Sequence, residues 1–231
     1  SGLGIEGIAM NPPCSACIDV CDDVSSADTA LNRVALCLRN AVARDNQKDV
    51  EVFTRLYALL LGAWAECRLT KLLYEPGAFT AAERDRICNV NTHLDRWHKV
   101  VEIAFRNHYE IPRAALSSRS LTHSAFTRLQ AVTQLLNNDL QFVISLRNKL
   151  AHGQWIYPLN DSGDDIAQEQ MDAIRTENIL SLQFKRSILD SLLNAVFDLA
   201  VSKPTFERDF DIHYRKVEQI RQNLKNRTYA A

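Results

Sequence analysis

Apolar residues recur every three or four positions through most of the chain, a spacing that places them on one face of an α-helix. Only seven Gly and six Pro occur among 231 residues, few for a chain of many short strands and tight turns. The spacing predicts helices over residues 26–45, 49–75, 80–109, 121–151, 167–176, 178–202 and 205–226. Residues 153–166, rich in turn-forming and acidic residues, are predicted to form a long exposed loop.

Three of these segments indicate how the helices pack and begin. The buried face of the first helix is predicted to carry Leu31, Val34, Leu38 and Val42. Segment 49–75 is apolar on nearly every side, as expected for a helix at the centre of a bundle. Thr80 followed by Glu83 resembles a capping box that opens the next helix. We therefore predict one all-α domain over residues 25–231, a single bundle of five to seven mostly antiparallel helices.

The first 24 residues stand apart from this pattern. If residues 1–9 are a leader added for expression, Met10 is the natural start, and residues 10–24 form a Cys-containing segment. Three thiols in this segment could bind a metal ion, those of Cys14, Cys17 and Cys21. No fourth ligand stands at a recognised spacing, so a packed or flexible amino terminus is the simpler interpretation. We expect no cofactor.

The other cysteines, Cys37, Cys67 and Cys88, lie within apolar helical patterns and are predicted to be reduced core thiols. The disulfide framework of a secreted protein would be expected to spread further along the chain. No secretory signal is visible, and no apolar run reaches the roughly 18 residues that a membrane-spanning helix needs. We therefore expect a cytoplasmic protein without a membrane partner.

Charge is balanced, with 27 Lys and Arg against 28 Asp and Glu and a formal net charge of -1. This balance argues against a protein that coats nucleic acid through bulk electrostatics, so any contact with nucleic acid must be local. The last predicted helix carries a basic row of Arg215, Lys216, Arg221, Lys225 and Arg227. That row could touch an RNA backbone or could simply be a solvated charged face.

One arginine interrupts the apolar stripe of the helix predicted over residues 121–151. The stripe consists of Ala125, Leu129, Val132, Leu136, Leu140 and Val143. The next positions on the same line are Arg147 and Leu150, so Arg147 stands where a core residue is expected. Burying a guanidinium without a partner is costly, and the group does not lose its proton. We expect an anion beside Arg147, either a structural carboxylate or a ligand phosphate.

Other polar residues follow Arg147 within two turns, in the run Arg147-Asn148-Lys149-Leu150-Ala151-His152-Gly153. On an unbroken helix Arg147 and His152 diverge by about 140°. They can converge only if the helix stops before His152, which Gly153 favours, or if a second subunit completes the site. Arginine offers a bidentate fork to phosphate oxygens, and histidine moves protons near neutral pH. The combination suits phosphate chemistry.

The run R-N-K-L-A-H-G resembles the signature of the HEPN superfamily (higher eukaryotes and prokaryotes nucleotide-binding), which is Arg, a polar residue, a short gap and His. The resemblance implies an all-α fold and a metal-independent ribonuclease that acts as a homodimer, with the paired motifs forming a cleft along the two-fold axis. The ribose 2′-hydroxyl would attack the adjacent phosphate and leave a 2′,3′-cyclic phosphate and a 5′-hydroxyl. Many members are toxins or defence nucleases, so a neutralising or regulatory protein is an expected partner.

On this resemblance His152 assists proton transfer, Arg147 stabilises the charge on phosphorus, and Asn148 orients the phosphate or the motif. Some members carry an acid on another helix, and Glu66 is the candidate here. Glu66 could pair with Arg147, tune His152, or form a simple internal salt bridge. One departure is Gln154, which stands where some members have a Tyr that a partner enzyme modifies.

Simpler interpretations exist for several of these residues. The side chains of Arg147, Asn148 and His152 could all cap the carboxyl end of the helix. The loose Arg–His spacing also occurs at Arg86/His93 and Arg208/His213, and the latter pair suggests a surface ion-pair cluster. His93 and His98 are five residues apart and fit no metal pair.

The residues that follow the motif supply candidate substrate contacts: Lys149, Trp155 and Tyr157. With Ile156, the two aromatic residues could stack on bases or cover a dimer seam.

The interpretation that fits most of these features is a metal-independent HEPN-type endoribonuclease, homodimeric, with RNA as its substrate. The alternative is a non-catalytic helical module of the same fold that binds nucleotide or a protein partner. A metal-binding regulator built on the amino-terminal cysteines is a third. An internal acid clasping Arg147, with His152 pointing into solvent in a lone monomer, would contradict the nuclease interpretation.

Overall fold

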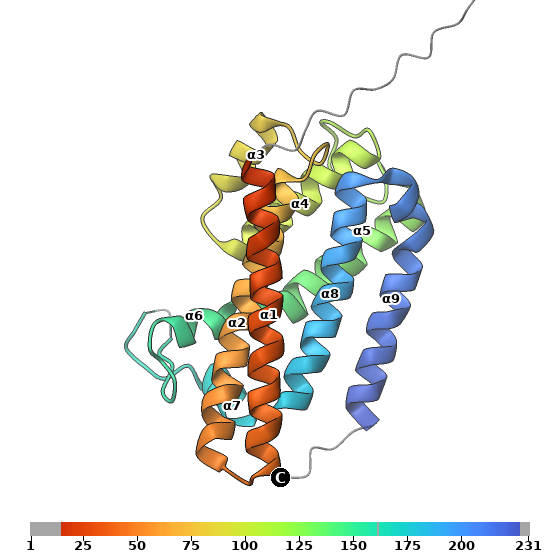
Figure 1. The fold of residues 1–231 in the computed structure, drawn as a ribbon. Helices are drawn as coiled ribbons and strands as arrows, with labels where there is room; N and C mark the ends of the chain where they lie inside the picture. Colours follow the sequence, from red (N-terminus) through yellow and green to blue (C-terminus); the bar gives the residue numbers. More distant parts are fainter. Residues whose placement is uncertain (1–14, 161, 227–231) are drawn as a thin grey trace, which may run out of the picture.

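The computed structural model describes residues 15–160 and 162–226, with side chains from residue 21 onward. This part of the chain is helical throughout, apart from its turns and one isolated bridge between Leu159 and Ile166 (Figure 1). Its helices are α1 (Ser15–Ala43), α2 (Gln47–Tyr74), α3 (Ala81–Cys88), α4 (His93–His108), α5 (His123–Leu135), the π-helical segment η1 (Leu136–Leu140), α6 (Gln141–Ala151), α7 (Gln168–Thr176), α8 (Ile179–Val201) and α9 (Lys203–Asn226). The predicted all-α bundle is confirmed.

One predicted helix, over residues 80–109, is two helices. The capping box is present: Thr80 Oγ1 accepts from the Glu83 backbone N–H at 3.3 Å, and Glu83 Oε2 accepts from the Thr80 N–H at 2.8 Å. The helix that it opens lasts eight residues, and a second N-cap at Thr92, which accepts from the Asp95 N–H at 3.0 Å, begins α4. If the contiguous α5, η1 and α6 are counted as one helix, the described residues form eight helices because of this break. The sequence predicts five to seven.

The first helix begins at Ser15, before the predicted start near residue 26, so part of the segment 10–24 belongs to α1. The buried face continues backward at seven-residue spacing, since Val24, Leu31 and Leu38 are all buried. Val42, predicted to share this face, is instead 41% exposed.

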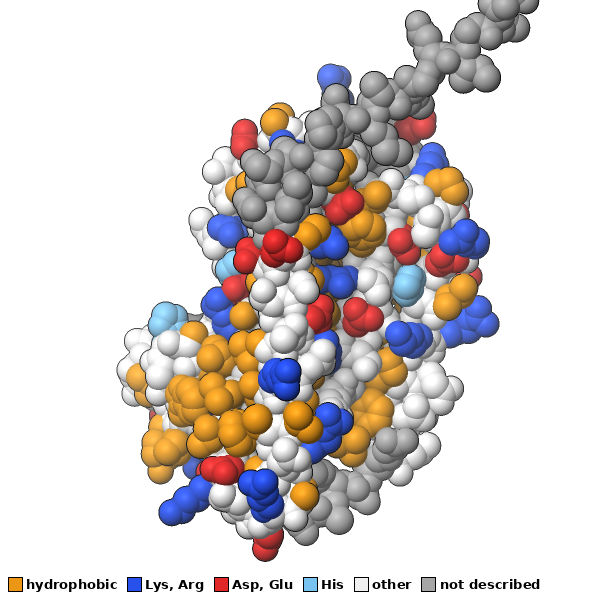
Figure 2. All heavy atoms as spheres, viewed as in Figure 1, with side chains coloured by type: hydrophobic (Ala, Val, Ile, Leu, Met, Phe, Trp, Pro, Cys, Tyr) orange, Lys and Arg blue, Asp and Glu red, His pale blue; other side chains and the backbone are white. Residues whose placement is uncertain are grey.

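α2, which its composition predicts at the centre of the bundle, is covered on only part of its surface. It packs against α1, α6 and α8. The contact with α6 is close because Gly62 has no side chain: a Cβ there would lie 2.4 Å from the Arg147 Cβ. One side of α2 stays open, and Val52 on it is 42% exposed. Figure 2 shows hydrophobic side chains gathered over this part of α2, beside the loop that follows α6.

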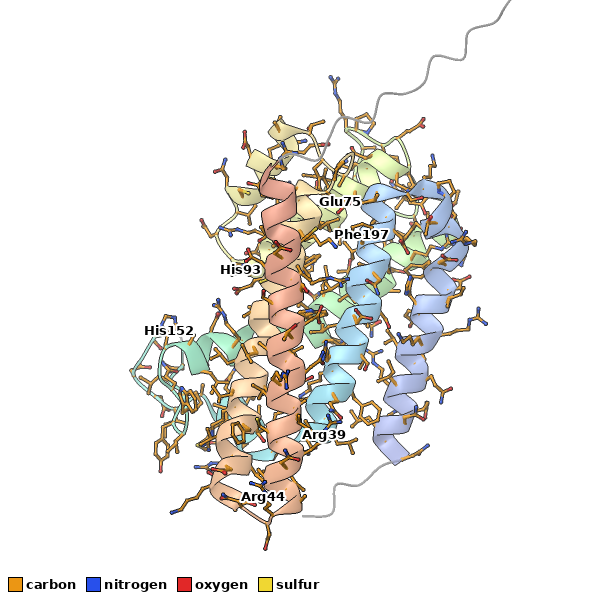
Figure 3. All side chains as sticks on the ribbon, viewed as in Figure 1. Arg39, Arg44, Glu75, His93, His152 and Phe197 are labelled. Carbon is orange, nitrogen blue, oxygen red and sulfur yellow. The ribbon has the colours of Figure 1, made fainter. Side chains whose placement is uncertain are left out.

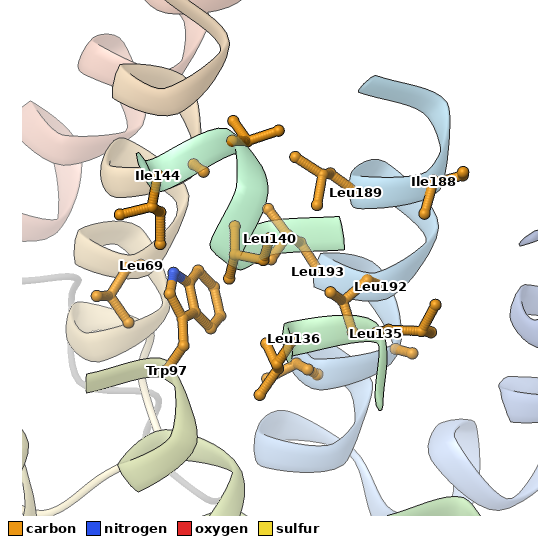
Figure 4. Packing of buried hydrophobic residues seen from close by; sticks show 14 of the residues in the cluster. Leu69, Trp97, Leu135, Leu136, Leu140, Ile144, Ile188, Leu189, Leu192 and Leu193 are labelled. Atoms are coloured by element: carbon orange, nitrogen blue, oxygen red, sulfur yellow. The ribbon is translucent and has the colours of Figure 1, made fainter. Parts of the chain in front are cut away.

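The helix predicted over residues 121–151 is confirmed as a continuous rod, with the π-helical turn η1 in its middle. The stripe residues Ala125, Val132, Leu136, Leu140, Val143 and Leu150 are buried, and Leu129 is half-buried. Figure 4 shows Leu136 and Leu140 between Trp97 on one side and Leu192 and Leu193 of α8 on the other, with Ile144 beside Leu69. This rod therefore runs through the core and carries Arg147 to its far end.

The end of α6 and the following loop project from one side of the bundle (Figure 1). α6 ends in a Schellman motif, in which the Gly153 N–H donates to Leu150 O and the Gln154 N–H donates to Lys149 O. Gly153 has φ 77°, the left-handed conformation that this motif needs. Among the residues that the structure describes, no helix combines the length and apolar character needed to cross a membrane.

Candidate active site

Arg147 meets a carboxylate from α2. Its Nη2 lies 2.6 Å from Glu66 Oε2, and its Nη1 donates to Asn148 Oδ1 at 3.0 Å. The side chains are largely covered, with 27% of Arg147 and 19% of Glu66 exposed. A structural carboxylate or a ligand phosphate is expected beside Arg147, and the structure shows a carboxylate. It belongs to Glu66, the acid predicted from the sequence as a candidate partner. The pairing offsets the cost of taking the guanidinium out of water.

Glu66 also faces a histidine that sequence reasoning set aside. His93 Nε2 lies 3.4 Å from Glu66 Oε1, and 35% of the His93 side chain is exposed. Thr92 caps α4, so His93 is the first residue of that helix and stands beside α2. The Arg147–Glu66–Asn148–His93 group is called the Arg147 cluster below. The spacing of Arg86 and His93 in the sequence does mark His93 as a candidate. The arginine in the same group as His93, however, is Arg147 and not Arg86.

Two atoms of the Arg147 cluster lack ordinary partners. Glu66 Oε1 and His93 Nδ1 are buried and make no hydrogen bond within the described residues; the contact of Glu66 Oε1 with His93 Nε2 at 3.4 Å is an ion-pair distance only. Buried polar groups nearly always find partners, and exceptions are concentrated where water, an ion or a ligand is bound. The cluster is therefore a polar site with unused hydrogen-bonding capacity, partly open to solvent.

His152 stands apart from the Arg147 cluster in the single chain. α6 stops at Ala151, as Gly153 predicts, and His152 is its C-cap, with its backbone N–H donated to Asn148 O at 3.1 Å. The imidazole is exposed, and no hydrogen bond or ion pair joins it to the described residues. Figure 3 shows His152 and His93 on the same side of the molecule, at the ends of different helices.

Side-chain capping does not explain the motif. The Schellman motif satisfies the last carbonyls of α6 with backbone donors. The Arg147 side chain donates instead to Asn148 Oδ1 and to Glu66 Oε2. Two features of the arrangement that would contradict a nuclease are nevertheless present. An internal acid, Glu66, holds Arg147, and His152 is exposed. The part that decides is whether a second chain covers His152.

The other predicted substrate contacts, Lys149, Trp155 and Tyr157, differ in whether their side chains are hydrogen-bonded within the fold or exposed. The Lys149 ammonium donates to Leu159 O at 2.7 Å, and the Trp155 indole N–H donates to Leu150 O at 3.0 Å, so both hold the loop. Tyr157 is 61% exposed, and its neighbour Ile156 is 52% exposed. Within this group the two exposed residues are the ones placed to meet a partner or a base.

The competing Arg–His pair at Arg208 and His213 does not form a site. Arg208 bonds to Asp209 on the surface, and His213 Nε2 lies 3.1 Å from Asp198 Oδ2. His98 bonds to Asn137 at 2.8 Å. The basic row of α9 is partly neutralised, because Arg221 bonds to Asp139 and Glu218, while Arg227 lies outside the described residues.

The cysteine predictions are partly wrong. Cys37 and Cys88 are exposed rather than core residues, and Cys67 is half-buried. Burial, with the negative charges of Asp23 and Glu66, raises the pKa of the Cys67 thiol. Cys14 and the Cys17 side chain lie outside the described residues, and within these no group of three or more His, Cys, Asp and Glu side chains could hold a metal ion.

Comparison of the chain with protein-family models, with curated proteins and with solved structures finds no match.

Proposed function

We propose that this protein is a metal-independent endoribonuclease of HEPN type, acting as a homodimer in which a second copy completes the site around His152. The observation that carries the proposal is the Arg147 cluster. A guanidinium occupies a core position of α6 and is held by a carboxylate and an amide, with part of it open to solvent, and the carboxylate also meets an imidazole. A cation placed and oriented in this way suits a phosphate.

The chemistry uses the remaining donors of Arg147. A guanidinium carries five N–H groups, and one bond to Glu66 and one to Asn148 leave others for phosphate oxygens. The ribose 2′-oxygen bonds to phosphorus as its proton passes to His152. The bond from phosphorus to the 5′-oxygen breaks, and that oxygen takes up a proton. The products are a 2′,3′-cyclic phosphate and a 5′-hydroxyl.

The homodimer has support in the surface beside His152. The loop after the motif exposes Ile156, Tyr157, Leu159 and Ile166. In Figure 2 hydrophobic side chains continue from this side over α2. Contiguous apolar surface of this kind is typical of a protein interface. A second copy seated there would cover His152 and bring two motifs together.

A second candidate is the non-catalytic module that binds nucleotide or a protein partner. It is favoured by the ion pair itself, because Glu66 already neutralises Arg147 and the His152 imidazole makes no hydrogen bond or ion pair with the cluster. A toxin or defence role, with a neutralising protein, belongs to the nuclease proposal and rests on it.

Cleavage of a mixed RNA in EDTA distinguishes the two candidates. Wild type is expected to cleave, and His152→Ala to lose about 100-fold or more, the usual contribution of a proton-transfer group. His123→Ala is the matched control, since His123 is an exposed histidine at the start of α5. Equal rates for wild type and His152→Ala, or no cleavage by wild type, would contradict the nuclease and favour the binding module.

A further inference from the structure

A small pocket lies between α7 and the rod formed by η1 and α6. Its volume is about 210 Å³. One wall carries Asn138, Gln141 and Ser145, and the opposite wall carries Glu169 and Gln170. Phe142, Leu146 and Ala173 also line it, so amide and hydroxyl groups and one carboxylate stand beside an apolar surface; we call this cavity the amide pocket.

The polar side chains of the amide pocket are not used elsewhere in the fold. No hydrogen bond or ion pair joins the side chains of Asn138, Gln141, Ser145, Glu169 or Gln170 to other described residues. Asn137, at the edge, is the exception and is fixed by His98 at 2.8 Å. Asn138, Gln141 and Glu169 are exposed and Ser145 and Gln170 half-buried, so the five side chains can bond to water or to a ligand in the cavity.

The π-helical turn helps to form this pocket. η1 spans Leu136–Leu140 and interrupts an otherwise α-helical rod, and Asn137 and Asn138 lie within it. Single π-turns inside α-helices occur frequently at functional sites. The turn keeps Leu136 and Leu140 in the core while the two asparagines are exposed beside the cavity.

The amide pocket opens on the face of α6 that carries Asn148 and His152, whereas Arg147 points toward α2, about 120–160° away from Gln141 and Ser145. Gln141, Ser145, Asn148 and His152 are spaced by four, three and four residues. At 100° per residue they fall within about 60° of one another around the helix. Ser145 precedes His152 by seven residues, which is about 10 Å along the axis. A strand that passes His152 could place a neighbouring base in the pocket.

The size and chemistry of the pocket fit a single base. Its volume equals that of roughly seven water molecules at about 30 Å³ each, which suits one ring system and not a whole nucleotide. Amide side chains match the donor and acceptor edges of bases, and a carboxylate accepts from an exocyclic amino group. Uracil has no such amino group.

We propose that the amide pocket binds one nucleobase bearing an exocyclic amino group, from the RNA strand on which His152 acts. The proposal rests on the proposed nuclease and names the specificity of that same site. Glu169 accepts from the amino group, and Gln141 and Gln170 bond to the remaining edge atoms. Bases are read one at a time in this way when single-stranded RNA is bound.

The test measures binding of 2′-O-methyl oligonucleotides, which cannot be cleaved because the attacking hydroxyl is blocked. Fluorescence anisotropy compares oligo-A, oligo-C and oligo-U. Wild type is expected to prefer A or C over U by about tenfold, since one good base contact is worth roughly 1–3 kcal/mol. Glu169→Gln and Gln141→Ala should reduce this preference to within about twofold.

The matched controls are Gln168→Ala on α7 and Gln130→Ala on α5, both exposed glutamines outside the pocket. They should keep the wild-type preference, and circular dichroism should show all four variants folded. Equal binding of the three strands by wild type would overturn the proposal. So would a preference that survives in both Glu169→Gln and Gln141→Ala.

The outcome also separates this proposal from the nuclease. If the blocked strands show the preference while wild type cleaves no RNA in EDTA, the nuclease is wrong and the base pocket stands. If RNA is cleaved through His152 while the blocked strands bind equally, the nuclease stands and the base pocket is wrong.

Discussion

At the residue scale, Arg147 owes its position to a glycine on another helix. Gly62 lets α6 cross α2 so closely that an added Cβ would lie 2.4 Å from the Arg147 Cβ and 2.6 Å from its Cγ. One turn further along α2, Glu66 receives the guanidinium. The close crossing and the ion pair therefore depend on each other.

We predict that Gly62→Ala destabilises the fold by about 1–3 kcal/mol, the usual cost of overpacking a tight contact. Elsewhere in a helix the same change usually stabilises by up to about 1 kcal/mol, because Ala is the better helix former. The sign of the effect therefore tests the contact, and chemical denaturation measures it. A Gly62→Ala variant more stable than wild type would show that α2 and α6 do not cross as described.

Much of the Arg147 cluster could be predicted from sequence, and the reason is local. Arg147 interrupts a regular stripe, and Glu66 interrupts an equally apolar helix, so each stands out against its neighbours. His93 does not stand out, because its contact with Glu66 depends on where α4 starts relative to α2. No periodicity along one segment contains that information. The exposure of Cys37 and Cys88 was missed for the same reason.

At the scale of elements, α9 is tied to the bundle through Glu207. Its carboxylate accepts from Tyr109 Oη at 2.8 Å and contacts Arg128 and His108 Nε2, the latter at 3.1 Å. Desolvation opposes ionisation of Glu207, but these hydrogen bonds outweigh it and lower its pKa. Burial lowers the pKa of His108 and, with Glu207, raises the pKa of Tyr109 to about 12.

These shifts predict that stability falls in acid. His108 has a pKa below its ordinary 6.5 and Glu207 one below 4.5, so in both cases the unfolded chain binds the extra proton more readily. The free energy of unfolding should therefore decrease below about pH 6.5 through His108, and decrease further below about pH 4.5 through Glu207. Denaturation at pH 7, 5.5 and 4 measures both steps.

His108→Gln should remove much of the decrease between pH 7 and pH 5.5 and leave the decrease toward pH 4. The exposed His123 supplies the control, because His123→Gln should leave the whole profile unchanged. An unaltered first step in His108→Gln would show that burial of this imidazole does not carry the effect.

Element boundaries were predictable where a side chain marks them. The capping box at Thr80 and the Gly153 stop are where the sequence indicates them. The break before α4 and the π-turn η1 were not predicted. Both keep the apolar spacing intact on either side, so the helical pattern runs through them unchanged. The early start of α1 was missed because Val24 is separated from Leu31 by a mostly polar stretch.

At the scale of the whole molecule, apolar side chains are exposed on the surface beside His152. They do not contribute to the core of the bundle. Ile156 and Tyr157 are more than half exposed, and α2 is uncovered on the same side. A fold of one chain explains the core but not this surface. The exposure of this surface could not be predicted from helical spacing, because the loop residues concerned have no period.

We predict that wild type sediments at twice the chain mass of 26.2 kDa. The double variant Ile156→Ser and Tyr157→Ser should sediment as a monomer, because each removed side chain weakens the contact by about 1 kcal/mol or more in both copies. Ile212→Ser is the matched control, since Ile212 is 55% exposed on α9. A monomeric wild type, or loss of the dimer in Ile212→Ser as well, would contradict a composite site at this surface.

The measurement that tests the central claim most directly is the chemistry of the ends on RNA incubated with the protein in EDTA. The proposed site predicts fragments with a 2′,3′-cyclic phosphate and a 5′-hydroxyl from wild type, identified by mass spectrometry, and intact RNA from Arg147→Ala and His152→Ala. Intact RNA after incubation with wild type, or the same fragments from His152→Ala, would contradict it.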